Sequence, residues 1–176
     1  MKFNKLILEG AYTIDLEPKT DDRGFFSRLF CQKEFDELGL ETKWKQINNS
    51  FSKNKFTLRG LHYQSEPMSE VKLVRCIKGC IWDVIVDLRS NSKTFGNWFA
   101  TELNENNRRM MYVPKGFAHG FMSLTENSEI LYLVSEFYSS EYERTLRWDD
   151  PLHNIQWPES PNVISNKDKI APYWKH

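Results

Sequence analysis

The sequence predicts a single domain, spanning residues 1–176, that is mainly β with one or few short helices. This length suits one domain with one hydrophobic core. Short runs of β-branched and aromatic residues recur along the chain, separated by turn-forming segments such as Asn104-Glu-Asn-Asn and Pro114-Lys-Gly. Many short strands at this spacing favour a β-sandwich or β-barrel over a fold in which strands and helices alternate.

The strongest strand signal lies in residues 72–89. Its second half alternates strictly, which is the period of a β-strand. One face carries Cys80, Trp82, Val84, Val86 and Leu88, and the other carries Ile81, Asp83, Ile85, Asp87 and Arg89. Lys78 and Gly79 interrupt the run, so we expect a hairpin turn there between two paired strands.

Weaker patterns complete the expected secondary structure. We expect further strands over residues 98–103, 109–113, 119–124 and 129–137, each bounded by turn residues. One helix is expected over residues 32–38, closed by Gly39. Residues 148–176 are rich in Pro, Trp and Asn, and we expect them to pack as irregular structure over the sheet.

Charge and composition exclude several classes of protein. Lys plus Arg and Asp plus Glu both number 24, so no overall field attracts nucleic acid or an anionic membrane. No apolar run approaches the roughly 20 residues of a membrane helix, and the N-terminus does not have the pattern of a signal peptide. We interpret Cys31, Cys76 and Cys80 as thiols in a reducing compartment, and we expect a cytoplasmic protein.

Two polar fragments narrow the β architecture. They are Arg59-Gly-Leu-His-Tyr-Gln64, which is followed by Glu70, and Pro114-Lys-Gly-Phe-Ala-His119. Together they resemble the two motifs of the cupin superfamily, whose fold is a β jelly-roll barrel. In cupins, a His-x-His pair, a Glu and a later His hold a metal. Gln64 replaces the second His here, so we expect no metal, although a site of His62, His119 and Glu70 remains an alternative.

Over nearly its whole length the sequence resembles the dTDP-4-dehydrorhamnose 3,5-epimerase family, the metal-free cupins of deoxysugar biosynthesis. The segments that carry this resemblance are residues 22–26, 46–50, 59–64, 72–75, 83–89, 94–96, 114–121, 132, 137–138, 148–151 and 165–168. The resemblance implies a cofactor-independent isomerase that acts on a nucleoside-diphosphate 4-keto-6-deoxy sugar. Inverting carbons 3 and 5 would convert dTDP-4-dehydro-6-deoxyglucose to dTDP-4-dehydrorhamnose.

Epimerisation beside a ketone requires a base on one face of the sugar, stabilisation of the enolate, and an acid on the opposite face. His62 matches the family's base, and histidine suits proton transfer near neutral pH. Asp168 matches the acidic partner that orients the imidazole. Lys72 is the cation for the developing oxyanion, and Tyr132 matches the proton donor.

The resemblance also implies substrate-binding residues. Arg23 and Arg59 match positions that bind the diphosphate, for which arginine has the right fork geometry. Tyr138 matches a residue that stacks on the base. The other matches to substrate-contacting positions are Gln46, Asn48, His119, Glu143 and Lys167.

Two positions depart from the family pattern. Arg28 stands where many members have a Glu that contacts the nucleotide, so hydrogen bonding to the base must change, and Arg28 is our candidate for nucleotide specificity. Leu133 stands where many members have Lys, but it should point away from the face that carries Tyr132.

The sequence leaves three alternative functions open. One is a single-carbon epimerase acting on a related sugar nucleotide, a second is a metal-dependent cupin, and a third is a non-catalytic protein that binds a sugar nucleotide. The resemblance further implies a homodimer in which N-terminal strands are exchanged, so that the region of Arg23 reaches the neighbour's site.

Overall fold

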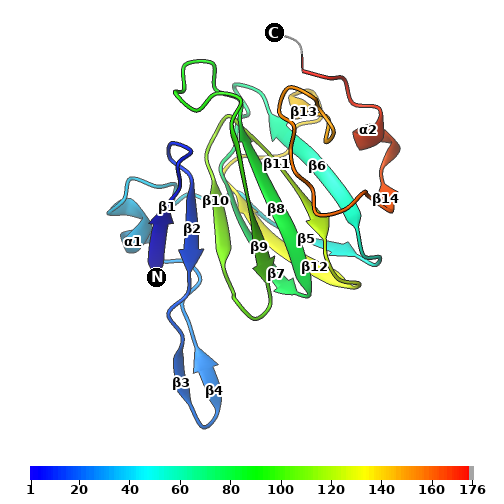
Figure 1. Ribbon diagram of the computed structural model, residues 1–176. Coiled ribbons are helices and arrows are strands. Elements are labelled where there is room, and N and C mark those ends of the chain that lie inside the picture. The colour runs from blue at the N-terminus through cyan, green and yellow to red at the C-terminus, as the bar shows by residue number, and fades with distance from the viewer. Residues whose placement is uncertain (175–176) are drawn as a thin grey trace.

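The computed structural model describes residues 1–174. Two sheets face each other and enclose a barrel (Figure 1). The first sheet has the order β1 (Lys2–Lys5), β2 (Tyr12–Asp15), β10 (Met110–Val113), β7 (Lys72–Lys78), β12 (Ser128–Val134) and β5 (Gln46–Ser52). The second has the order β13 (Glu143–Thr145), β6 (Thr57–Gln64), β11 (Phe117–Ser123), β8 (Cys80–Asp87) and β9 (Trp98–Asn104). The expected mainly β, cupin-type jelly-roll barrel is confirmed.

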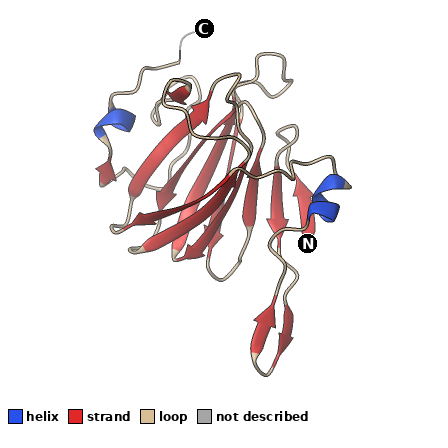
Figure 2. Ribbon diagram, turned by 180° about the vertical axis from the view of Figure 1, so that it is seen from behind, coloured by secondary structure: helices blue, strands red, loops and turns tan. Residues whose placement is uncertain are grey.

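Five short elements lie outside these two strand orders. The hairpin of β3 (Lys19–Asp21) and β4 (Gly24–Phe26) projects away from the barrel (Figures 1 and 2). Strand β14 (Val163–Ile164) pairs in parallel with β6. The helices are α1 (Gln32–Asp36) and α2 (Asn166–Lys169). No helix within residues 1–174 is long and apolar enough to cross a membrane.

Strand β8 shows how the sequence alternation forms the core. Ile81 and Ile85 point between the two sheets and pack against side chains of both. Val84 and Val86 lie on the opposite face, where Leu146, Ile155, Trp157 and Trp174 cover them. Both faces of β8 are therefore buried, and the C-terminal segment packs over the second sheet as expected.

The prediction of a hairpin between paired strands at Lys78 and Gly79 is wrong. Strand β7 pairs with β10 and β12 in the first sheet, whereas β8 pairs with β9 and β11 in the second. The chain crosses from one sheet to the other at Gly79, where φ is +74°. A Cβ atom there would lie 2.6 Å from Thr125 Oγ1, so this corner requires glycine.

The remaining expected elements are confirmed, with shifted ends. Helix α1 is two residues shorter than expected, and Gly39 follows it with φ +66°. The strands expected after residue 97 correspond to β9, β10, β11 and β12. Residues 148–174 are largely irregular but include β14 and α2, and residues 175–176 of this expected segment lie outside the described part. All three cysteines are free, and Cys76 is buried.

Strands β6 and β11 approach each other unusually closely at two glycines. A Cβ atom on Gly60 would lie 2.6 Å from the Cα of Gly120, and one on Gly120 would lie 2.7 Å from the carbonyl oxygen of Arg59. The register between the strands also shifts between His119 and Phe121. Beyond this point His62 pairs with His119, so the close approach sets two histidines side by side on one wall of the barrel.

Candidate active site

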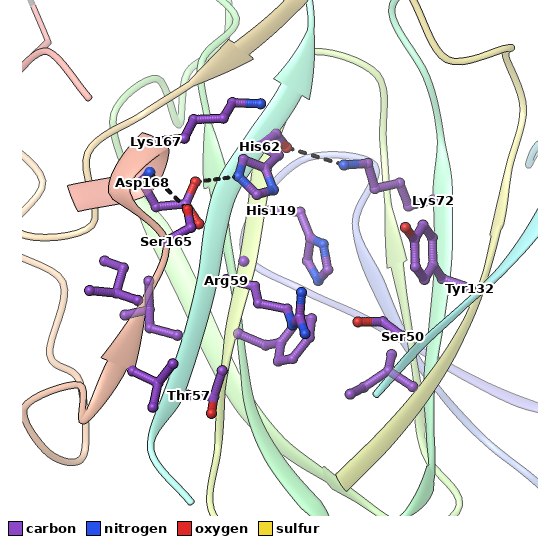
Figure 3. A pocket seen from close by; sticks show the side chains of 16 residues that line it. Ser50, Thr57, Arg59, His62, Lys72, His119, Tyr132, Ser165, Lys167 and Asp168 are labelled. Carbon is purple, nitrogen blue, oxygen red and sulfur yellow. Dashed lines mark hydrogen bonds and ion pairs between the residues drawn. The ribbon is translucent and has the colours of Figure 1, made fainter. Parts of the chain in front are cut away.

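A cavity of about 500 Å³ opens between the two sheets. The four predicted catalytic residues line it, each from a different element: His62 of β6, Lys72 of β7, Tyr132 of β12 and Asp168 of α2 (Figure 3). Arg59, His119 and Lys167 also line this cavity. The structure therefore assembles the four predicted catalytic residues and three of the predicted binding residues around one space.

His62 and Asp168 form a hydrogen-bonded pair in this cavity. The Nε2 atom of His62 lies 2.6 Å from Oδ1 of Asp168, whose side chain is only 4% exposed. Oδ2 of Asp168 accepts a hydrogen bond from the backbone N–H of Gly60. Ser165 caps α2 by accepting from the backbone N–H of Asp168, which fixes the helix turn that carries the carboxylate.

The ionisation of Asp168 determines which nitrogen of His62 is free. Burial by itself would raise the pKa of Asp168, but the hydrogen bond and charge of His62, together with bonds from Gly60 and Ser165, lower it below its usual value. An ionised carboxylate only accepts hydrogen bonds, so Nε2 of His62 carries the proton in this pair. In the neutral form of the imidazole, Nδ1 then carries the free lone pair, and this nitrogen faces the cavity (Figure 3).

Lys72 and Tyr132 stand on the other wall. Nζ of Lys72 donates to the carbonyl oxygen of His62 at 3.2 Å and lies 3.2 Å from Oε1 of Glu70. Burial raises the pKa of Tyr132, the charge of Glu70 raises it further, and Arg59 opposes both. Tyr132 is therefore a phenol at neutral pH and can donate a proton.

The two walls belong to different sheets, and this separates the two proton-transfer groups. His62 projects from β6 of the second sheet, whereas Tyr132 projects from β12 of the first. Figure 3 shows the two side chains on either side of the cavity. A planar intermediate held between them would present one face to the imidazole and the other to the phenol.

A second histidine–carboxylate pair lies in the same wall as His62. Nε2 of His119 is 2.8 Å from Oδ1 of Asp83, and both side chains are buried. Among the described residues, Oδ2 of Asp83 has no hydrogen-bond partner. Asp83 was not among the site residues predicted from the sequence. Its position between Ile81 and Ile85, on the inward face of the strand, was the signal that could have identified it.

A smaller cavity of about 170 Å³ adjoins the larger one and shares His62, Lys72 and Tyr132 with it. Four more of the predicted binding residues line it: Gln46, Asn48, Tyr138 and Glu143. The hydroxyl group of Tyr138 donates to Oε2 of Glu143 at 3.0 Å, and the backbone N–H of Tyr138 donates to Oε1 of Gln46. Lys167 pairs with the other oxygen of Glu143, which links the rims of the two cavities.

Arg23 and Arg28 line neither cavity. Arg23 lies in the turn between β3 and β4, where its side chain is 90% exposed and bonds Asp21. Arg28 pairs with Glu34 at 3.1 Å. By contrast, Arg59 is held in the cavity wall by its bond to the carbonyl oxygen of Phe51. The structure therefore does not bring the two N-terminal arginines to the site of their own chain.

Gln64 does not take the place of a metal ligand. Its Nε2 donates to the carbonyl oxygens of Met68 and Phe137, and its Oε1 accepts from the backbone N–H of Ser139. Within residues 1–174, no three His, Cys, Asp or Glu side chains are grouped as metal ligands would be. The alternative site of His62, His119 and Glu70 is therefore not assembled, and Gln64 instead anchors the segment next to Tyr138.

The fold and this site define a cupin-type protein with an acid–base cavity. The chain belongs to the dTDP-4-dehydrorhamnose 3,5-epimerase family, whose model matches residues 5–176. The epimerase of that name from Shigella flexneri is 46% identical over 155 residues, covering 86% of this chain and 85% of the relative.

Solved structures agree with this assignment. The epimerase of Elizabethkingia anophelis superimposes with a TM-score of 0.95 at 40% identity, covering 99% of this chain and 96% of the other. The Legionella pneumophila enzyme, solved in complex with dTDP-4-keto-L-rhamnose, gives a TM-score of 0.91 at 37% identity, covering 98% and 92%.

Proposed function

We propose that this protein is an isomerase that converts dTDP-4-dehydro-6-deoxyglucose to dTDP-4-dehydrorhamnose by inverting carbons 3 and 5. The family and the sugar nucleotide in the Legionella pneumophila structure support this substrate. The observation that carries the proposal is the placement of His62 and Tyr132 on opposite walls of one cavity. Inversion needs the base and the acid on opposite sides of the sugar, since one proton must leave one face of the carbon and another must be added to the other face.

The proposed reaction moves protons without changing the oxidation state of the substrate. Nδ1 of His62 removes a proton from carbon 3 or 5, and the electrons of the broken C–H bond are delocalised onto the ketone oxygen. Lys72 stabilises the resulting enolate, an interaction worth several kcal/mol in a site shielded from water. Tyr132 then returns a proton to the opposite face of the carbon. His62 and Tyr132 exchange protons with water before the second inversion, and no redox cofactor is required.

Binding of the nucleotide end is assigned to residues that line the two adjoining cavities. Tyr138 offers a ring that is 61% exposed, as stacking on a base requires. Arg59 and Lys167 supply positive charge for the diphosphate, while Gln46, Asn48, His119 and Glu143 supply hydrogen bonds. Arg28 lies away from both cavities of its own chain, so any effect of this residue on nucleotide choice requires a second subunit.

We further propose a homodimer in which the β3–β4 hairpin completes the site of the neighbouring subunit. The hairpin projects from the barrel (Figure 1), and Phe26 on it is 68% exposed. Arg23 at its tip would then reach the diphosphate of the partner's substrate. Each subunit acts as one domain over residues 1–176, and the free thiols suit a reducing compartment such as the cytoplasm.

Incubation with the 4-keto sugar nucleotide in deuterated water tests the proposed function. We expect NMR to show deuterium at both carbon 3 and carbon 5 of the product. Label at one carbon only would identify a single-carbon epimerase instead, and absence of label with dTDP- and other nucleotide-linked 4-keto sugars would reject the enzyme. His62→Asn should abolish exchange while the circular dichroism spectrum stays unchanged.

A further inference from the structure

Glu70 is a largely buried carboxylate to which the proposed reaction assigns no role. It lies in the wall of the smaller cavity beside His62, Lys72 and Tyr132. Its side chain is only 12% exposed, and its Oε1 lies 3.2 Å from Nζ of Lys72. A buried carboxylate must have partners that offset its loss of hydration, and Lys72 is the charged one.

The contacts of Lys72 hold its ammonium group and leave it able to donate to a further acceptor. An ammonium carries three N–H donors. One is directed to the carbonyl oxygen of His62, and the ammonium also forms an ion pair with Oε1 of Glu70 at 3.2 Å. One acceptor belongs to β6 and the other to the loop before β7, and together they fix the end of a side chain with four rotatable bonds, which would otherwise lose much conformational entropy on being ordered.

Glu70 also contacts Gln64. Its Oε2 lies 3.3 Å from Nε2 of Gln64, whose two N–H groups are shared among this carboxylate and the carbonyl oxygens of Met68 and Phe137. Gln64 is 4% exposed and is fixed by the backbone at Met68, Phe137 and Ser139. A chain of contacts therefore runs from the loop after β12 through Gln64 and Glu70 to the ammonium of Lys72.

We infer that Glu70 is a positioning residue, which holds the ammonium of Lys72 so that a free N–H points at the substrate's ketone oxygen. This inference rests on the proposed function and adds a residue to it. Glu70 acts through Lys72 and does not touch the substrate. Because the enolate oxygen carries more charge than the ketone, misplacing Lys72 raises the barrier more than it weakens binding.

Three substitutions separate position from charge. Glu70→Gln keeps the length of the side chain and one oxygen for Lys72. Glu70→Asp keeps the charge but withdraws it by one carbon–carbon bond, and Glu70→Ala removes the contact. We expect Glu70→Ala and Glu70→Asp to lower kcat by about 10- to 100-fold, the scale of loss that a misplacement of about 1 Å can cause. KM should change by less than about 3-fold, and Glu70→Gln should retain kcat within about 5-fold.

Two controls test whether a loss of kcat in the Glu70 variants reflects only a disturbed structure. Glu126→Gln changes an exposed carboxylate in the turn before β12 and should leave kcat unchanged. Calorimetry with dTDP, which lacks the sugar, should give wild-type affinity for every Glu70 variant. The inference is overturned if Glu70→Asp and Glu70→Ala keep wild-type kcat, if Glu70→Gln is as slow as Glu70→Ala, or if KM rises while kcat stays constant.

A double-mutant cycle tests the route through Lys72. In a Lys72→Met background, Glu70→Asp should change the slow deuterium exchange at carbons 3 and 5 by less than about 3-fold, because the group it positions is absent. An equal loss in both backgrounds would show that Glu70 acts elsewhere. If the wild type exchanges deuterium but the Glu70 variants match it, only this inference fails; a wild type without exchange would reject the proposed function itself.

Discussion

His62 and Asp168 meet at 2.6 Å although 106 residues separate them in the chain. The contact depends on the C-terminal segment, because β14 pairs with β6 just before α2 brings Asp168 to the cavity. The carboxylate orients the imidazole and would stabilise the imidazolium that forms when His62 accepts a proton.

Asp168→Asn should lower kcat by about 100- to 10,000-fold, because an amide no longer selects the tautomer with a free Nδ1 and does not neutralise the imidazolium. The cap by Ser165 uses the backbone N–H of residue 168, so we expect the fold to remain. Steady-state kinetics with circular dichroism measure both effects. Asp149→Asn, at an exposed carboxylate paired with Arg147, is the matched control. Wild-type kcat in Asp168→Asn would contradict the role of the pair.

Tyr132→Phe should separate proton removal from inversion. Without the phenol, His62 still removes a proton but can return one only to the same face, so deuterium enters the substrate while its configuration is retained. We expect net epimer formation to fall by about 100-fold or more. NMR measures label and configuration in one sample, and Tyr173→Phe on the C-terminal segment serves as control. Epimer formation at the wild-type rate would exclude Tyr132 as the acid.

Tyr138→Ala should weaken binding of dTDP with little effect on kcat. Stacking of a base on an aromatic ring contributes about 1–3 kcal/mol, which corresponds to a rise in Kd of about 5- to 150-fold. Tyr138→Phe keeps the ring and loses only the hydrogen bond to Glu143, so its Kd should stay within about 3-fold of wild type. Isothermal titration calorimetry distinguishes the two. Equal losses in both variants would assign the effect to the hydroxyl.

Asp87 provides a pH-dependent contribution to stability away from the site. Burial by itself would raise its pKa, but hydrogen bonds from Arg89, Ser92 and Thr94 prevail and lower it to about 2. A lowered pKa in the folded state contributes stability above the unfolded value of about 4, and this contribution is lost as the pH falls from about 4 to 2.

Asp87→Asn should therefore reduce the free energy of unfolding by about 2 kcal/mol at pH 7. Urea denaturation at pH 7, 5, 4 and 3 measures the difference between variant and wild type, which should narrow only below pH 4. A difference that stays constant from pH 7 to pH 3 would show that the stabilisation does not depend on the ionised carboxylate.

Much of the site was predictable from its sequence motifs. The alternation of β8 and the fragments around His62 and His119 are local patterns, and the resemblance of the whole chain selected Lys72, Tyr132 and Asp168. The local pattern failed at Gly79, where two adjacent strands enter different sheets. It also missed Asp83 and the contacts of Glu70, since nothing local in the sequence says which buried carboxylate meets which cation.

By itself the sequence determined the class of fold, the family and most of the residues that gather at the site, because side-chain period and motif order can be read along the chain. Only the tertiary structure decided which strands pair, that His62 and Tyr132 face each other from different sheets, and that Arg23 and Arg28 lie outside their own chain's cavities. The physical reason is that strand pairing joins segments far apart in the chain. Its outcome depends on the burial and hydrogen bonding of the whole barrel rather than on any single segment.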